Sequence, residues 1–162
     1  MRLCKVLRPL MKHALLKMIR AELRQRLERL SKAACEAHAA ATDPGSKAEG
    51  KYDTRSLEAS YLAAGQARQV DELAEALRIF ETLKLPDFAM EDAIDAGALV
   101  EVEMNGETAL FLLAPAAGGL VLDDGGLEIT LLTPASGLYR KLLGMRLGET
   151  LEDPKLRVTE LS

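Results

Sequence analysis

The stretch from Pro9 to Ala41 contains no further glycine or proline and is rich in strong helix formers. Apolar or small residues recur in it at alternating steps of three and four residues: Ile19, Leu23, Leu27, Leu30, Ala34, Ala37 and Ala41. This spacing is typical of the buried seam of a coiled coil. At about 1.5 Å per residue such a helix is roughly 48 Å long, so it needs a partner helix along its length.

A second helix of similar length is predicted after a short break. Asp43-Pro44-Gly45 favours a turn, and Ser46 followed by Glu49 fits a capping box at a helix start. The stretch from 46 to 83 then carries a compatible seam, made of Tyr52, Ala59, Ala63, Val70, Leu73, Leu77 and Phe80. Because two helices joined by a tight turn lie antiparallel, residues 1–84 are expected to form a coiled-coil hairpin with its tip near residues 42–53.

Beyond Asp87 the helical spacing gives way to alternation of apolar and polar residues. LVEVEM and ETALFLL flank Asn105-Gly106, which predicts a hairpin with a type I′ turn, and Asp123–Gly126 separates a second pair of strands. Residues 133–144 favour a short helix ending at Gly144, and residues 156–161 a last strand. The predicted fold class is α+β: a helical hairpin followed by a small α+β domain with an antiparallel sheet in residues 85–162.

Charge and composition narrow the function classes. Residues 1–32 carry ten Lys and Arg against two Glu, although the whole chain has a net charge of −4. This segregation suggests that different faces meet different partners. No stretch is apolar enough to span a membrane, and no secretory cleavage site follows the basic N-terminus. Cys4 and Cys35 would lie about 46 Å apart on one helix, too far for a disulfide. We therefore expect a cytoplasmic protein.

Most catalytic templates are absent from the sequence, including the nucleophile elbow, the P-loop and paired Cys-x-x-Cys motifs. Cys35 and His38 share a helical face but lack further zinc ligands nearby, so a flank of the coiled coil explains them better. Asp43, Glu49 and Asp53 gather acidic groups near the turn. They are explained equally well as helix caps or as ligands for a hard cation such as Mg²⁺.

Two stretches resemble a known family. TPASGLYRKLLGMRLGETL, residues 133–151, resembles the C-terminal signature of the bacterial Gre transcript-cleavage factors (GreA and GreB), and SKAEGKYD, residues 46–53, is similar to their tip. We call residues 133–151 the C-terminal signature. Its matching positions are Pro134, Ser136, Leu142, Leu143, Gly144 and Gly148.

The resemblance implies an FKBP-like C-terminal domain whose signature docks on RNA polymerase, and a hairpin that enters the secondary channel of the polymerase. It implies a monomeric elongation factor that is no enzyme itself and has no catalytic residue of its own. The implied factor would bind no cofactor alone, and its contact with nucleic acid would be indirect. Glu49 and Asp43, with Asp53 nearby, would share a Mg²⁺ ion with the polymerase and assist cleavage of backtracked RNA at its 3′ end. The residues implied to contact RNA or polymerase are Lys12, Lys17, Arg20 and Arg24.

The tip departs from the family pattern. The family has an Asp three residues before the tip Glu, whereas Ser46 holds that place before Glu49. An alignment through Tyr61 instead puts Thr54 and Leu57 at the two acidic positions. Two functions therefore stay open: an elongation factor that stimulates cleavage, and a channel binder that regulates transcription without it. A coiled-coil adaptor unrelated to polymerase is a third. Prolyl isomerase activity is not expected, because residues 86–162 hold only three aromatic side chains.

Overall fold

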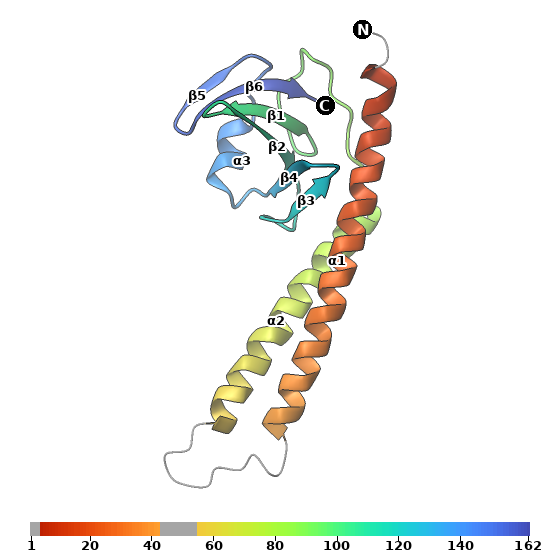
Figure 1. Ribbon diagram of the computed structural model, residues 1–162, viewed down its shortest axis with the longest axis vertical. Coiled ribbons are helices and arrows are strands. Elements are labelled where there is room, and N and C mark those ends of the chain that lie inside the picture. Colours follow the sequence, from red (N-terminus) through yellow and green to blue (C-terminus); the bar gives the residue numbers. More distant parts are fainter. Residues whose placement is uncertain (1–3, 43–54) are drawn as a thin grey trace. The chain divides into compact units, whose positions relative to one another are not determined.

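The structure is a computed structural model in which residues 4–42 and 55–162 are described. Two long helices precede a six-stranded sheet and a short helix (Figure 1), so the predicted helical hairpin and α+β class are confirmed. The elements in chain order are α1 Cys4–Thr42, α2 Arg55–Thr82, β1 Leu99–Met104, β2 Glu107–Leu113, β3 Val121–Asp124, β4 Leu127–Leu132, α3 Gly137–Leu142, β5 Thr150–Glu152 and β6 Lys155–Leu161. None of the described helices is both long and apolar enough to cross a bilayer.

The chain divides into two compact units. The helical unit is Arg20–Glu81, and the sheet unit combines Met1–Ile19 with Thr82–Ser162. Helix α1 contributes to both, because the division falls between Ile19 and Arg20 within one continuous helix. The sequence predicts two domains that meet after residue 84. A division into compact units does not show where independent domains begin and end, so this boundary stays a prediction.

The helical unit is an antiparallel pair. Arg20 and Arg24 of α1 contact Phe80 and Glu81 at the end of α2, so the two helices run in opposite directions. Leu23 and Phe80 are fully buried, while the leucines further along both seams are half-buried. The apolar seams predicted from the sequence therefore face each other where they are described.

The sheet has the strand order β3-β4-β2-β1-β6-β5. β1 and β2 form the predicted hairpin, and Asn105 and Gly106 both have positive φ, at 55° and 83°, as a type I′ turn requires. All neighbours are antiparallel except β2 and β4, which are parallel. The sheet is thus mixed, not wholly antiparallel as predicted. β3 runs opposite to β2, so the hairpin β3–β4 brings β4 back in the direction of β2.

Both faces of the sheet are covered at its centre. Four consecutive residues of β2, 110–113, are buried, a pattern that arises when a strand is packed on both sides. One face packs against α3 and the segments that flank it, through Ile94, Tyr139, Leu142 and Met145. The first part of α1 adds buried Leu15 and Leu16 to the same compact unit. This core fixes the position of α3 and of the C-terminal signature.

Candidate functional site

Helix α3 and the turn before it present the first half of the C-terminal signature. Ser136 is the N-cap of α3, but its side chain makes no capping hydrogen bond. Pro134 is exposed and Leu143, directly after α3, is 39% exposed. Leu142 is fully buried in the core beneath them. The signature therefore holds a buried anchor and a set of surface groups: Pro134, Ser136 and Leu143.

The second half of the signature shapes the backbone. Gly144 and Gly148 have positive φ angles of 82° and 85°, which glycine adopts without strain. The Gly144 N–H donates to the Ile94 carbonyl at 2.8 Å, and the Gly148 N–H donates to Val158 at 2.9 Å. Arg146 adds a side-chain hydrogen bond to the Glu91 carbonyl. These glycines thus fasten the end of α3 to neighbouring segments of the sheet unit.

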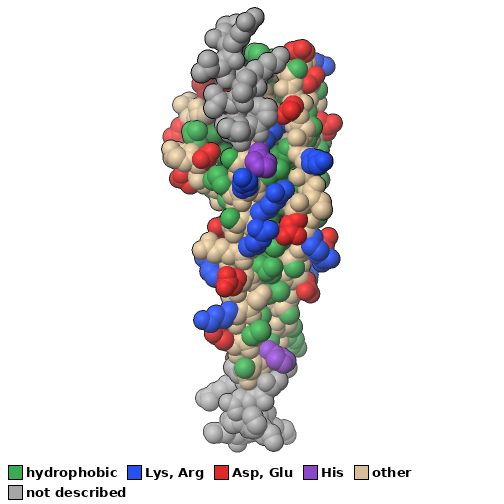
Figure 2. Space-filling model, turned by 90° about the vertical axis from the view of Figure 1, so that its right-hand side faces the viewer, with side chains coloured by type: hydrophobic (Ala, Val, Ile, Leu, Met, Phe, Trp, Pro, Cys, Tyr) green, Lys and Arg blue, Asp and Glu red, His purple; other side chains and the backbone are tan. Residues whose placement is uncertain are grey.

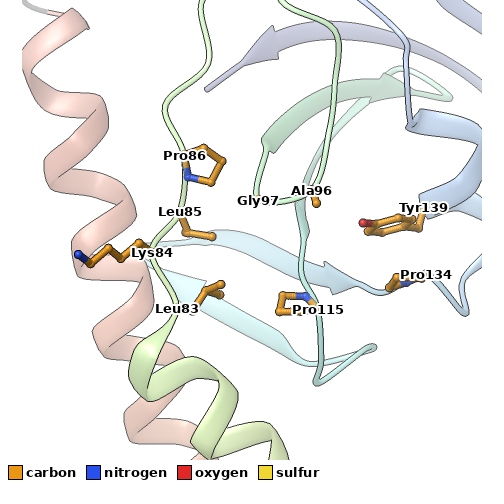
Figure 3. Close-up of a pocket in the computed structure, with 9 residues that line it drawn as sticks. All are labelled: Leu83, Lys84, Leu85, Pro86, Ala96, Gly97, Pro115, Pro134 and Tyr139. Atoms are coloured by element: carbon orange, nitrogen blue, oxygen red, sulfur yellow. The ribbon is translucent and has the colours of Figure 1, made fainter.

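A pocket of about 360 Å³ lies beside the signature. Leu85 and Pro86 line one side of it, and Tyr139 and Pro134 line the other (Figure 3). Gly97 makes this geometry possible, because a Cβ atom there would lie 2.5 Å from Cδ of Pro86. The complete lining is Leu83, Lys84, Leu85, Pro86, Ala96, Gly97, Pro115, Pro134 and Tyr139.

The polar groups of this pocket are few. The Lys84 side chain extends away from the other lining side chains (Figure 3). The N–H groups of Ala96 and Gly97 are bonded to Asp95 and to the Leu113 carbonyl, and the three proline residues have no N–H to offer. Tyr139 is 5% exposed, and its hydroxyl points into the space between the two walls. The pocket is therefore apolar and uncharged, with one side-chain hydroxyl inside it.

The first two basic residues predicted to contact RNA or polymerase lie in the first part of α1. Lys12 is only 4% exposed, donates to the Pro86 carbonyl and lies with its ammonium 5.1 Å from the centre of the Phe88 ring. Lys17 is exposed. Lys12 thus joins α1 to the segment after α2, which leaves it little surface for a partner, whereas Lys17 is accessible.

The other two predicted basic residues lie in the helical unit. Arg20 is half-buried and its Nε donates to the Phe80 carbonyl at 2.8 Å. Arg24 is exposed and pairs with Glu81 at 3.1 Å. Lys and Arg side chains along the helices are interspersed with Asp and Glu side chains (Figure 2). The face of the helical unit in this view is therefore of mixed charge, and the contact role of these residues stays a prediction.

The acidic tip and its capping box, Asp43, Ser46, Glu49 and Asp53, lie outside the described residues. Cys35 and His38 are described and exposed on α1. Within residues 4–42 and 55–162 the structure brings together no group of three or more side chains of the kinds that hold metals.

The sequence did not predict the observed roles of two residues. Tyr139 was noted only as one of three aromatic residues, yet it lines the pocket. Lys12 was assigned to a surface and is buried. The available signal for Lys12 was Leu15 and Leu16 close by, which place this part of α1 against an apolar surface.

No protein-family model and no curated protein sequence matches the chain. Solved structures do match. GreA factor homolog 1 (Gfh1) of Thermus thermophilus is 25% identical, with 88% of this chain and 94% of that chain covered and a TM-score of 0.35. Gfh1 of Thermus aquaticus is 18% identical over 90% and 94%, with a TM-score of 0.35. A structure of the transcription factor Gfh1 is 23% identical over 90% and 94%, with a TM-score of 0.36. Each of these three Gfh1 structures is aligned with about nine-tenths of this chain.

Proposed function

We propose that the protein is a Gre-like transcription factor that binds RNA polymerase and extends its helical hairpin into the secondary channel, thereby modulating elongation. One observation carries the proposal: an antiparallel helix pair is combined in one chain with a sheet unit that presents the C-terminal signature around α3. It would act in the bacterial cytoplasm as a monomer, and its sheet unit would be FKBP-like.

The surface groups of the signature, Pro134, Ser136 and Leu143, are the proposed docking contacts. The buried Leu142 and the two glycines hold these contacts in place. Replacing Leu143 by Asp would put a charge into the docking surface and lower the affinity for RNA polymerase by at least about tenfold. Leu127→Asp is the matched control, because Leu127 is also an exposed leucine but lies on β4 outside the signature. Equal affinities of both variants would contradict docking through Leu143.

Stimulation of RNA cleavage is the finer part of the proposal. Glu49 with Asp43 or Asp53 would complete a Mg²⁺ site that belongs to the polymerase, so the factor would be no enzyme on its own. In a backtracked complex, Glu49→Ala should abolish RNA shortening while polymerase binding survives. Glu58→Ala is the control, since Glu58 lies in the first turn of α2, beyond the tip.

The alternative is a channel binder that regulates transcription without supporting cleavage. It is favoured by Ser46, which stands where the resembled family has an Asp. The same assay decides between the two: wild-type protein that binds the backtracked complex and leaves the RNA at full length is such a regulator. A chain that does not bind polymerase at all would instead be a coiled-coil adaptor.

A further inference from the structure

We infer that the free edge of β3 binds an extended segment of a partner protein, which adds to the sheet as a further strand with two neighbouring basic residues followed by two aliphatic ones. The inference goes beyond the proposed function, because β3 lies outside the C-terminal signature. It rests on the backbone groups, the exposed apolar side chain and the charges of Val121–Asp124.

The first support is the unpaired backbone of β3. This strand ends the sheet order and pairs with β4 on one side (Figure 1). Leu120, just before β3, accepts a backbone hydrogen bond from Leu131 at 2.8 Å. Because the direction of bonding alternates along an antiparallel ladder, the N–H and C=O groups of Val121 and Asp123 face away from β4. In the described part of the chain, no backbone hydrogen bond from another segment reaches these groups.

The second support is the set of side chains along this edge. Val121 is 45% exposed, and Asp123 and Asp124 are exposed beside it. Neither aspartate forms an ion pair with any residue that the structure describes. An added strand would therefore gain apolar contact at Val121 and charge attraction at the aspartates. The opposite edge strand, β5, has three residues, and its one apolar side chain is half-buried.

The charges identify the occupant. A second copy of β3 would bring Asp123 and Asp124 close to the same carboxylates, so the edge disfavours pairing with itself. An antiparallel strand, the slightly more stable orientation, passes the two aspartates first and Val121 last. Its first two residues are therefore Lys or Arg, and its next two are Val, Ile or Leu. Binding of this kind, by strand addition to a sheet edge, takes its affinity from the backbone and its specificity from alternate side chains.

The test is a nuclear magnetic resonance titration of the isotope-labelled, full-length protein with the peptide acetyl-Thr-Lys-Arg-Val-Ile-Thr-amide. We expect a dissociation constant below about 1 mM. At about 90% occupancy, the amides of Val121 and Asp123 should exchange about tenfold more slowly, because each gains an acceptor. The same peptide with N-methyl groups on Arg and Ile, whose N–H groups would face β3, should bind at least about tenfold more weakly.

Two double variants test the charges. Asp123→Asn with Asp124→Asn removes both charges and keeps the side-chain oxygen that accepts from Gly126, so it should weaken binding by about threefold to tenfold. Asp87→Asn with Glu91→Gln is the matched control, because it removes two exposed charges from the segment before β1. The control should change the affinity by less than about twofold, since charges distant from the edge are screened.

Four results would overturn the inference. They are a dissociation constant above about 1 mM, equal binding of the N-methylated peptide, equal affinities of the two double variants, and shifts confined to residues outside β3 and β4. Slow exchange of the Val121 and Asp123 amides without peptide, increasing with protein concentration, would instead make a second copy the occupant and would also contradict the inference. None of these results bears on polymerase binding, which is measured separately.

Discussion

Among single residues, Lys12 combines two interactions that a buried ammonium group needs. It donates to the Pro86 carbonyl, and its charge lies 5.1 Å from the centre of the Phe88 ring. Both partners belong to the segment that follows α2, so the side chain fastens the first part of α1 to that segment. Removing the charge would leave the carbonyl without this donor and the ring without its cation.

Replacing Lys12 by Met keeps most of the apolar stem but removes the ammonium group. We expect the free energy of unfolding to fall by about 1–3 kcal/mol, from one lost hydrogen bond and one lost cation–π contact. Urea denaturation followed by circular dichroism measures this loss. Lys17→Met is the control, since Lys17 is exposed and its replacement should change stability by less than about 0.5 kcal/mol. Equal losses in both variants would show that the Lys12 contacts contribute nothing.

The sequence predicted the structural roles of only some of these residues. Gly144 was predicted to end a helix, and it does so because a positive φ is a local property. The sequence did not predict that Tyr139 and Pro115 line the same pocket, because they are distant in the sequence and come together only when the sheet forms. Lys12 was assigned to a basic surface because Leu15 and Leu16 indicate that this part of α1 is buried but do not indicate that Pro86 and Phe88 lie against Lys12.

Among the elements, the β1–β2 and β3–β4 hairpins and the last strand were predicted, but the way in which they join into one sheet was not. Asn105-Gly106 specifies the turn, and the turn specifies the pairing of its own two strands. The parallel pairing of β2 with β4 is not determined by any turn, because 13 residues separate Leu113 from Leu127 and include another strand. Strand β5 was missed because three residues, Thr150–Glu152, are too few to show alternation.

Gln66 is a polar residue in the seam of the helical pair. It lies three residues after Ala63 and four before Val70, which are the steps of the seam on α2. Its Oε1 atom is buried and has no hydrogen-bond partner within the described part of the chain. An unsatisfied amide oxygen at this position destabilises the pair, and polar seam residues of this kind restrict helix register in coiled coils.

Replacing Gln66 by Leu should therefore raise the free energy of unfolding by about 1 kcal/mol, because it removes the unsatisfied group and adds apolar contact. The measurement is thermal unfolding followed by the circular dichroism signal of the helices. Gln69→Leu serves as the control, since Gln69 is exposed on the same helix and should change stability by less than about 0.5 kcal/mol. A destabilised Gln66→Leu variant would mean that the glutamine has a partner in solution.

At the scale of the whole molecule, the two units differ in how completely they bury their apolar residues. In the sheet unit, Val100, Val102, Leu112 and Val158 are almost fully inaccessible. On α2 of the helical unit, Tyr61 and Leu62 are 71% and 58% exposed, and the seam beside them is formed by alanine and glutamine. Regions with little buried apolar surface open locally at lower free-energy cost.

Hydrogen exchange should reflect this difference. We expect the amides of β1, β2 and β6 to exchange slowest, and those of residues 60–67 on α2 to exchange at least about tenfold faster after correction for intrinsic rates. Mass spectrometry of peptic fragments at several time points measures both in one sample. Equal protection of the two segments would contradict the expectation, and greater protection on α2 would reverse it.

The division between Ile19 and Arg20 falls inside one uninterrupted helix, and this limits how the gene can change. An α-helix advances about 100° per residue, so inserting a single codon there would turn Leu23, Leu27 and Leu30 by that angle relative to Lys12, Leu15 and Leu16. Leu23 is buried within the helical unit, and Leu15 and Leu16 are buried within the sheet unit. Insertions and deletions that are not close to whole turns would change the directions in which the two sets leave the helix relative to each other, whereas point substitutions would not. In comparisons among natural variants, changes in length are therefore expected in turns such as residues 105–106, and not in this part of α1.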